Sequence, residues 1–382
     1  MTLRLLRRSS VWVALRAAAI VTVVAGLAAC AGSGRPDPTP LQPLEAKVSG
    51  RQVWKSSIGK VRFPLAVAVN GGVFTVADDN GRVVALQADS GKEVWRAEVG
   101  ERLSAGVGSD GRYASVVTRE NQLVTLEGGK VLWRQTLPSR VVTAPLVAGE
   151  RVFVLAVDRA VHAYDALDGR KLWSYQRESD ALNLATAGVL QPFRDTLLVG
   201  QGAKLVGLDP LRGSVRWEAT LASPRGTNEV ERLADLVAPV ARLGSVVCAR
   251  AYQNAVACVN AERGSTIWSR NAGGLAGVGA DDQVVVGVDA SDRINAWKTA
   301  DGTPSWTAES LLFRNLTAPL VVGKTAVVGD LKGMVHWFAA DTGQPVLRLP
   351  TDGSAIKVVP VASGLTLLVV TSDGGLYAFR PE

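Results

Sequence analysis

The chain offers few residues of the kinds that catalyse reactions or hold metals. It has two histidines, His162 and His336, and three cysteines among 382 residues. Each histidine stands in a short apolar segment of β-strand character, where a structural role is the default. A Ser/His/Asp hydrolase needs a histidine held between a nucleophile and a carboxylate, and a zinc site needs histidines and cysteines at ligand spacing. Since neither pattern occurs, we predict no catalytic residues and no metal site.

One cysteine, Cys30, ends a segment with the order of a secretion signal. Four arginines and no acidic residue precede it, and an apolar run extends from Val11 to Leu27. Sec signal peptides have this order of positive charge, apolar helix and small residues, and the run is short for a membrane span. The sequence Leu27-Ala28-Ala29-Cys30 resembles the lipobox of bacterial lipoproteins, whose cysteine receives a lipid and becomes the new N-terminus. We therefore expect residues 1–29 to be removed and Cys30 to carry the lipid; ordinary cleavage beside a chance cysteine is the alternative.

Residues 30–47 have the composition of a tether. Ala31 follows the lipid cysteine where inner-membrane lipoproteins usually carry aspartate, so the resemblance implies sorting to the outer membrane. Prolines recur between Gly32 and Leu44 and favour an extended, polyproline-like chain. We expect this tether to hold the rest of the protein in the periplasm, at a distance from the lipid.

The charge of the mature chain excludes one class of partner. The formal net charge is +7, but the four arginines of the signal segment account for most of it, leaving 38 basic and 35 acidic residues, or +3. Nucleic-acid-binding proteins cluster lysine and arginine along the phosphate track. Because no such cluster remains in the sequence, we predict no nucleic-acid partner.

A repeat organises the chain after residue 48. A glycine stands four residues before a tryptophan in seven copies, and an eighth copy keeps the glycine but has leucine in place of the ring. Successive copies lie 38 to 51 residues apart, which is the spacing of four-stranded propeller blades. The copies are Gly50/Trp54, Gly91/Trp95, Gly129/Trp133, Gly169/Trp173, Gly213/Trp217, Gly264/Trp268, Gly302/Trp306 and Gly343/Leu347.

Each copy also carries the local signals of β-strands. An Ala-Pro pair opens the innermost strand in several copies, because proline is tolerated as a first strand residue. The third strand carries a small residue and then a larger apolar one, as in Ala85-Leu86. A tight turn then ends in the repeat glycine, which accepts positive φ, and the outer strand bears the tryptophan. We expect each indole ring to pack between neighbouring blades. The Ala-Pro pairs are Ala144-Pro145, Ala238-Pro239 and Ala318-Pro319.

The two ends of the chain complete one another. After the last repeat the sequence predicts three strands, near Ile356–Val361, Leu365–Thr371 and Leu376–Phe379, and no fourth. Before the first complete repeat it predicts one orphan outer strand around Val53–Ile58. Three strands and one strand make an eighth blade, and closure removes open sheet edges. We therefore predict an all-β fold, an eight-bladed propeller over residues 48–382.

Cys248 and Cys258 flank a predicted hairpin turn at Gln253-Asn254. Their spacing allows a cross-strand disulfide in an oxidising periplasm. The position of Cys258, where other repeats carry alanine or glycine, favours instead a buried free thiol. We assign neither cysteine a function.

The third and fourth strands of the repeat resemble the quinoprotein-dehydrogenase-like repeat, which Asp89-Ser90-Gly91 and Asp341-Thr342-Gly343 match. Two families carry this repeat: enzymes that bind pyrroloquinoline quinone (PQQ), and the BamB lipoproteins of the β-barrel assembly machinery. A quinone enzyme needs a cation site, a catalytic carboxylate and aromatic or vicinal-disulfide walls around the cofactor. The sequence has no Cys-Cys pair and few residues beyond its blades to cap a cofactor, so we expect no cofactor and no enzyme activity. A PQQ-binding dehydrogenase or sensor is the alternative function.

Several motifs resemble the BamB family over the whole chain. They include the lipobox, the Pro-rich segment Pro40-Leu41-Gln42-Pro43-Leu44 and the stretch from Leu311 to Trp337. The insertion that lengthens one repeat to 51 residues, Gly226 to Asp235, resembles the family's long loop with its Glu-x-x-Arg-Leu-x-Asp core. The resemblance implies a non-catalytic scaffold that assists the assembly of β-barrel proteins into the outer membrane.

In that family, a Leu-x-Leu-Arg segment and the long loop contact the POTRA region of the barrel assembly protein BamA. The resemblance carries these roles over to Leu182, Leu184, Arg232 and Asp235, whereas the family's arginine is Ala185 here and a second family aspartate is Val237. The leucines could also be strand residues that face the core, and the loop could be a tolerated insertion.

Further partners follow from the same resemblance. They are the other Bam lipoproteins and nascent β-barrel proteins, which would bind by edge-strand pairing. A propeller that binds some other envelope protein is the remaining alternative.

Overall fold

The computed structural model of the protein describes residues 35–63, 65–177, 182–224 and 227–381. The chain divides into two units, Met1–Pro38 and Thr39–Glu382, and all the strands belong to the second. The predicted signal peptide and Cys30 lie outside the described residues. Within the described ranges, no helix is both long enough and apolar enough to cross a membrane.

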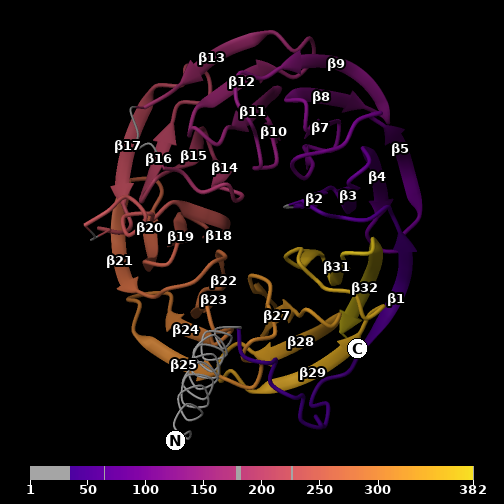
Figure 1. Cartoon of the computed structure of the whole chain (residues 1–382), viewed down its shortest axis with the longest axis vertical. Helices are drawn as coiled ribbons and strands as arrows, with labels where there is room; N and C mark the ends of the chain where they lie inside the picture. The colour runs from indigo at the N-terminus through magenta and orange to yellow at the C-terminus, as the bar shows by residue number, and fades with distance from the viewer. Residues whose placement is uncertain (1–34, 64, 178–181, 225–226, 382) are drawn as a thin grey trace, which may run out of the picture. The chain divides into compact units, whose positions relative to one another are not determined.

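The described residues form eight antiparallel sheets of four strands each, arranged in a ring (Figure 1). In seven sheets the strands follow chain order from the centre of the ring outward, and in the eighth the N-terminal strand β1 (Gly50–Ser57) lies outermost (Figure 1). The fold is therefore the predicted eight-bladed β-propeller. Each sheet is one blade, and the blades are numbered here along the chain.

The first four blades have the following strands. Blade 1 contains β2 (Ala68–Asn70), β3 (Val73–Ala77), β4 (Arg82–Gln87) and β5 (Glu93–Glu98); blade 2 contains β6 (Gly108–Ser109), β7 (Tyr113–Val117), β8 (Gln122–Glu127) and β9 (Lys130–Thr136). Blade 3 contains β10 (Leu146–Ala148), β11 (Arg151–Leu155), β12 (Val161–Asp165) and β13 (Lys171–Tyr175); blade 4 contains β14 (Leu190–Phe193), β15 (Thr196–Gln201), β16 (Lys204–Leu208) and β17 (Val215–Thr220).

The second four blades continue the ring. Blade 5 contains β18 (Leu236–Leu243), β19 (Val246–Ala251), β20 (Ala255–Asn260) and β21 (Ser265–Asn271); blade 6 contains β22 (Val278–Ala280), β23 (Val284–Val288), β24 (Ile294–Lys298) and β25 (Pro304–Ala308). Blade 7 contains β26 (Leu320–Val322), β27 (Thr325–Gly329), β28 (Met334–Ala339) and β29 (Pro345–Pro350); blade 8 contains β30 (Val361–Ser363), β31 (Thr366–Val370), β32 (Gly375–Pro381) and β1 (Gly50–Ser57).

Blade 8 closes the ring as the sequence predicted. The N-terminal strand β1 pairs antiparallel with β32, and Trp54 lies opposite Ala378. The innermost strand of this blade differs from the prediction, because it begins at Val361 and not at Ile356. Pro360 has no N–H to donate to a strand ladder, so the pairing starts after it. Ile356 pairs with this sheet through an isolated bridge to Thr371, and its N–H donates to the Asp330 carbonyl.

The hydrophobic core lies in the seams between blades. Buried apolar residues form eight clusters among the described residues, and each cluster joins two neighbouring sheets. Because every sheet is covered on both faces, its middle strands are continuous apolar runs, as parallel sheets buried on both sides also show. Strands β7 and β31 are buried at every residue.

The repeat tryptophans lie in these seams. In six seams the ring rests against the repeat glycine of the next blade, where a Cβ atom would overlap it, and in five of these a hydrogen bond also crosses the seam. The indole Nε1–H donates across the seam to a backbone carbonyl at 2.7–3.0 Å. These five pairs are Trp54/Gly91, Trp133/Gly169, Trp173/Gly213, Trp268/Gly302 and Trp306/Gly343.

The other repeat positions vary this contact. The Trp217 ring also lies against Gly264, but Gly129 faces the Arg96 carbonyl and only the Cβ atom of Trp95. In the eighth repeat, Leu347 contacts Gly50. The seams therefore share one geometry with local exceptions.

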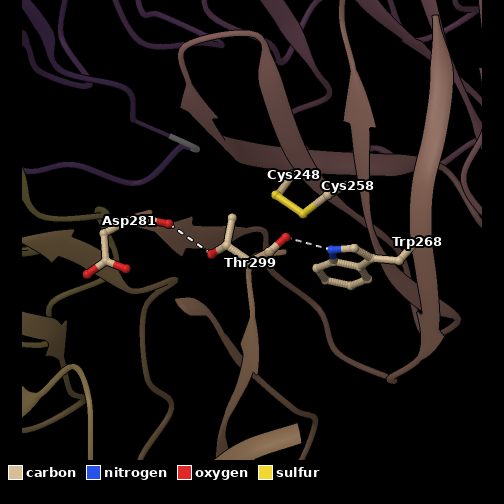
Figure 2. Close-up of a disulfide and its surroundings, with 5 residues drawn as sticks. All are labelled: Cys248, Cys258, Trp268, Asp281 and Thr299. Atoms are coloured by element: carbon tan, nitrogen blue, oxygen red, sulfur yellow. Dashed lines mark hydrogen bonds between the residues drawn. A yellow bond between two sulfur atoms is a disulfide. The ribbon is translucent and has the colours of Figure 1, made fainter. Parts of the chain in front are cut away.

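The prediction of a buried free thiol at Cys258 is wrong. Cys248 of β19 and Cys258 of β20 lie directly opposite one another, with their Cα atoms 4.0 Å apart, and are joined by a disulfide (Figure 2). Directly opposed residues of antiparallel strands bring their side chains this close, and the sequence did not show this register. The disulfide is fully buried and packs with Trp268 in the cluster between blades 5 and 6.

Candidate partner-binding site

Asp235 brings together the two segments that the sequence predicted as a partner contact. It follows the long loop and immediately precedes β18. Its Oδ2 atom accepts a hydrogen bond from the Leu184 N–H at 3.2 Å. Its Oδ1 atom accepts from Arg159, with the Nε atom at 2.9 Å and the Nη2 atom at 2.7 Å. The long loop, the segment around Leu184 and the turn between β11 and β12 therefore meet at one carboxylate.

The ion pair between Arg159 and Asp235 is mostly buried. The side chains are 15% and 14% exposed. Breaking a buried pair by removing one partner leaves a charge without compensation, which costs more than losing a surface pair. Asp235 therefore acts within the chain as a clamp that holds the Leu184 segment against the long loop.

Leu182 and Leu184 are half-buried, and neither belongs to a strand, since β13 ends at Tyr175 and β14 begins at Leu190. The interpretation of these leucines as strand residues is therefore wrong. Leu184 lines a small cavity of about 40 Å³ together with Leu155 and Asp235. The next residue, Ala185, is exposed. The segment is an irregular connection whose leucines are partly accessible.

The long loop is an ordered turn in its described part. The Thr227 N–H and hydroxyl both donate to Glu231 Oε2, at 2.8 and 3.2 Å, and the Glu231 N–H donates to Asn228 Oδ1 at 2.9 Å. The hydrogen bond from the Thr227 N–H, followed by that from its hydroxyl, lowers the pKa of the Glu231 carboxyl. These bonds present Val230, which is 68% exposed, and Arg232, which is also exposed.

A basic depression of about 470 Å³ lies beside this loop. Arg232 lines it together with Arg159, Arg177 and Lys204. Arg177 and Lys204 share the carboxylate of Glu218, and Arg159 is paired with Asp235. Four cations thus face two carboxylates, so the depression has an excess of positive charge. Arg159 lines both this depression and the small cavity that Leu184 lines.

Sequence reasoning identified Leu184 and Asp235 but not Arg159, Arg177 or Lys204. Arg159 lies in a turn with φ at 64°, 76 residues from its partner. The sequence signal for it was weak, because an arginine in a β-turn is ordinary. Only the ring geometry brings blade 3 and the start of blade 5 together here.

The histidines have structural partners. His336 Nδ1 accepts from Arg348 Nε at 3.3 Å, so its Nε2 atom carries the proton and donates to Asp330 Oδ2 at 3.0 Å. Arg314 Nε also donates to that oxygen, at 2.8 Å. His162 Nδ1 bonds to Ser174 Oγ at 2.9 Å. In the part of the chain that the structure describes, no three His, Cys, Asp or Glu residues gather as metal ligands.

The same arginines bind part of the predicted tether. Arg314 Nη1 donates to the Thr39 carbonyl at 2.9 Å, and Arg348 Nη1 donates to the Gln42 carbonyl at 3.0 Å. The Thr39 N–H donates to the Leu312 carbonyl, and the Lys47 N–H donates to the Val346 carbonyl. From Thr39 onward, this segment therefore follows blade 7.

Comparisons with known proteins give one family. The family model of the outer membrane protein assembly factor BamB matches residues 44–103 and 79–308. The chain is 36% identical to BamB of Burkholderia pseudomallei, with 100% of both chains covered. It is 31% identical to BamB of Bordetella pertussis over 98% of this chain and 100% of that one. For BamB of Escherichia coli the identity is 26%, over 89% of this chain and 91% of the relative.

Solved structures agree on the fold. The crystal structure of BamB from Moraxella catarrhalis superposes with a TM-score of 0.79 at 21% identity, covering 87% of this chain and 100% of that chain. Quinohemoprotein alcohol dehydrogenase from Comamonas testosteroni superposes with a TM-score of 0.60 at 15% identity, covering 96% and 84%. At these identities the likeness shows a shared propeller, and a propeller by itself implies no function.

Proposed function

Since this chain belongs to the BamB family of outer membrane protein assembly factors, we propose that it is a non-catalytic scaffold of the β-barrel assembly machinery. In this proposal it binds BamA and helps β-barrel proteins to assemble into the outer membrane. The other Bam lipoproteins and nascent barrel strands are further partners. A strand could add to a blade edge by β-augmentation.

A lipid at Cys30 would hold the propeller at the periplasmic side of the outer membrane. Each buried methylene of a lipid chain contributes about 0.8 kcal/mol, so two or more chains give stable anchoring. Nine residue steps separate Cys30 from Thr39, the residue that Arg314 holds on blade 7. A fully extended chain spans at most about 3.5 Å per residue, so this length limits the reach to about 30 Å.

The observation that carries the BamA proposal is the clamp formed by Asp235. It holds the leucine segment and the long loop side by side, 51 residues apart in sequence. The surface then combines partly accessible leucines with a basic depression, as a protein interface combines an apolar centre with a polar rim. Arg232 and Arg177 offer the positive charge that Ala185 lacks. This surface suits an acidic patch on the POTRA region.

The proposal is tested by retention of the full lipoprotein on the immobilised periplasmic region of BamA. Leu182→Asp and Arg232→Glu should each weaken retention at least tenfold, because they place negative charge on the contact without touching the Asp235 clamp. Leu211→Asp is the control, since it places the same charge on an exposed leucine of another connection, 60% exposed. Equal retention of all three variants would show that the contact lies elsewhere.

The alternative of a quinone enzyme is favoured only by the likeness to quinohemoprotein dehydrogenases, which concerns the fold. Adding PQQ and calcium to the same protein tests it. Stoichiometric binding of the quinone with dye reduction would favour that alternative over the scaffold.

A further inference from the structure

The seam between blades 7 and 8 differs from the other seams because its repeat tryptophan is absent. Leu347 of β29 takes that position and contacts Gly50, the repeat glycine of the next blade. An isobutyl group fills less of the seam than an indole. A cavity of about 220 Å³ opens at this place.

The residues that line this cavity correspond to those that an indole ring contacts in the other seams. Gly50 and Leu347 both line it. Its aromatic walls are Trp337 and Phe379, whose rings meet edge to face with centroids 5.8 Å apart. Leu365, which is 75% exposed, also lines the cavity.

The strand register identifies the hydrogen-bond acceptor that a ring N–H would use here. In the five seams with an indole hydrogen bond, the acceptor carbonyl belongs to the next blade. It lies three residues after the residue that pairs with that blade's own repeat tryptophan, or with Leu347 in blade 7. In blade 6, for example, Trp306 pairs with Ala296, and the acceptor of the preceding indole is Thr299. In blade 8, Trp54 pairs with Ala378, so the equivalent acceptor is the carbonyl of Pro381. Pro381 lines the cavity.

The seam between blades 3 and 4 provides a comparison, because there the tryptophan is present. A cavity of about 360 Å³ lies at the equivalent place, and its walls carry Arg151, Arg194 and Asp195. Among the described residues, neither Trp173 nor Gly213 belongs to its lining. The indole ring of Trp173 therefore separates that cavity from Gly213. At Leu347 the cavity instead reaches the glycine, and its charged lining residues are Lys324 and Arg380.

The size and chemistry of the site select an aromatic ring. A cavity of about 150 Å³ lined by leucine and phenylalanine side chains is large enough to bind benzene, and the present cavity is larger. Five other seams show the occupant that this environment takes, an indole on a glycine floor with its N–H bonded to a carbonyl.

We propose that the cavity between blades 7 and 8 binds one aromatic side chain of an unfolded outer-membrane β-barrel strand. The source of the ring rests on the proposed function, whereas the ring site itself rests on the seam geometry. Barrel strands carry girdles of aromatic residues at both membrane interfaces. A strand that passes the cavity mouth at Leu365 inserts one ring and leaves its backbone outside.

The ring site is tested with N-acetyl-tryptophanamide as the probe and N-acetyl-glycinamide as the control, by saturation-transfer NMR on the full chain in detergent micelles. The wild type should bind the tryptophan probe with a dissociation constant on the order of 1 mM, as expected for one small ring system. Leu347→Trp supplies the ring from the chain itself and should weaken probe binding at least tenfold, with an equal or higher Tm.

Two further variants make the ring test decisive. Trp306→Leu makes the reverse exchange in the seam between blades 6 and 7 and should create a second probe site. Leu365→Asp changes only the exposed mouth and should weaken binding even if Leu347→Trp does not fold. Equal binding of the probe by the wild type and by either folded variant, Leu347→Trp or Leu365→Asp, would overturn the ring site.

The source of the ring is tested with a photo-crosslinking benzoylphenylalanine at Val48, another cavity-lining position, and an unfolded barrel precursor. Leu347→Trp should reduce the cross-link yield several-fold while retention on BamA stays unchanged. An unchanged yield would overturn the barrel strand as occupant. Failure of wild-type retention on BamA would instead contradict only the scaffold proposal, because probe binding is measured without any partner.

Discussion

The indole ring of Trp54 lies directly against Gly91 of the next blade, and its Nε1–H donates to the Ala88 carbonyl at 3.0 Å. The glycine meets two separate demands. Its φ is +69°, in the left-handed region that side chains disfavour, and a Cβ atom on it would overlap the ring. Glycine thus both ends the turn and provides the surface on which the ring packs.

Gly91→Ala should lower the free energy of unfolding by about 3 kcal/mol. About 1 kcal/mol comes from the left-handed backbone and the remainder from overpacking against the ring. Gly72→Ala is the matched control, because Gly72 has φ at +77° but open space around its Cα atom, and it should cost only about 1 kcal/mol. Urea unfolding followed by tryptophan fluorescence measures both. Equal costs would show that the Trp54 contact adds nothing.

The contrast between the seams and the clamp shows what could be predicted from the sequence. Gly91 and Trp95 recur because every blade makes the same contact, so the repeat, the blade count and the closure by β1 are visible as periodicity. Asp235 and Arg159 lie in connections that follow no repeat, and only the curvature of the ring brings them together. The register that opposes Cys248 to Cys258 was hidden for a similar reason, since the two turn residues alone do not determine the pairing.

Removing the disulfide should destabilise blade 5 without affecting the candidate partner surface. A cross-link that closes a loop of about ten residues stabilises by up to about 3 kcal/mol through the unfolded state. The double variant Cys248→Ala/Cys258→Ala should therefore have a lower Tm than the wild type under oxidising conditions, and a reductant should narrow the difference. Retention on BamA should not change. A reductant-insensitive difference would mean that lost packing, not the cross-link, accounts for the effect.

The buried network around Asp330 predicts acid sensitivity. Burial would by itself raise the pKa of Asp330, but hydrogen bonds from His336, from the Met334 N–H and from Arg314 outweigh it and hold this pKa at about 2. A carboxyl whose pKa is lowered on folding stabilises the protein above its unfolded value, and this stabilisation disappears as the pH falls toward the folded value. Unfolding should therefore become easier by about 2 kcal/mol between about pH 4 and pH 2.

Two histidines add to this acid sensitivity in the same direction. Burial lowers the pKa of His336 and of His162, so both are neutral in the folded protein and resist protonation as the pH falls below about 6.5. Asp330→Asn should flatten the dependence between pH 4 and pH 2 while lowering stability at pH 7, because Arg314 loses its buried partner. Urea midpoints across this pH range measure both effects. If Asp330→Asn leaves the pH dependence of the urea midpoint unchanged, other carboxyls account for the loss of stability in acid.

The pair Arg159–Asp235 should control the order of the leucine segment. Asp235→Asn keeps the volume and an acceptor for the Leu184 N–H but loses the charge that compensates Arg159, and we expect a cost of about 2 kcal/mol, since a partly buried pair lies between surface and fully buried values. Amide exchange at Leu184 should accelerate more than exchange in β15, because the hydrogen bond is local.

The exposed pair Arg293–Glu309 provides the control for this clamp, because its side chains are 42% and 57% exposed. Glu309→Gln should cost less than about 1 kcal/mol and leave exchange at Leu184 unchanged. If Asp235→Asn weakens retention on BamA while Leu184 exchange stays slow, Asp235 contacts the partner directly. If exchange and retention change together, Asp235 acts by positioning Leu182 and Leu184, which is the outcome that its buried pairing with Arg159 predicts.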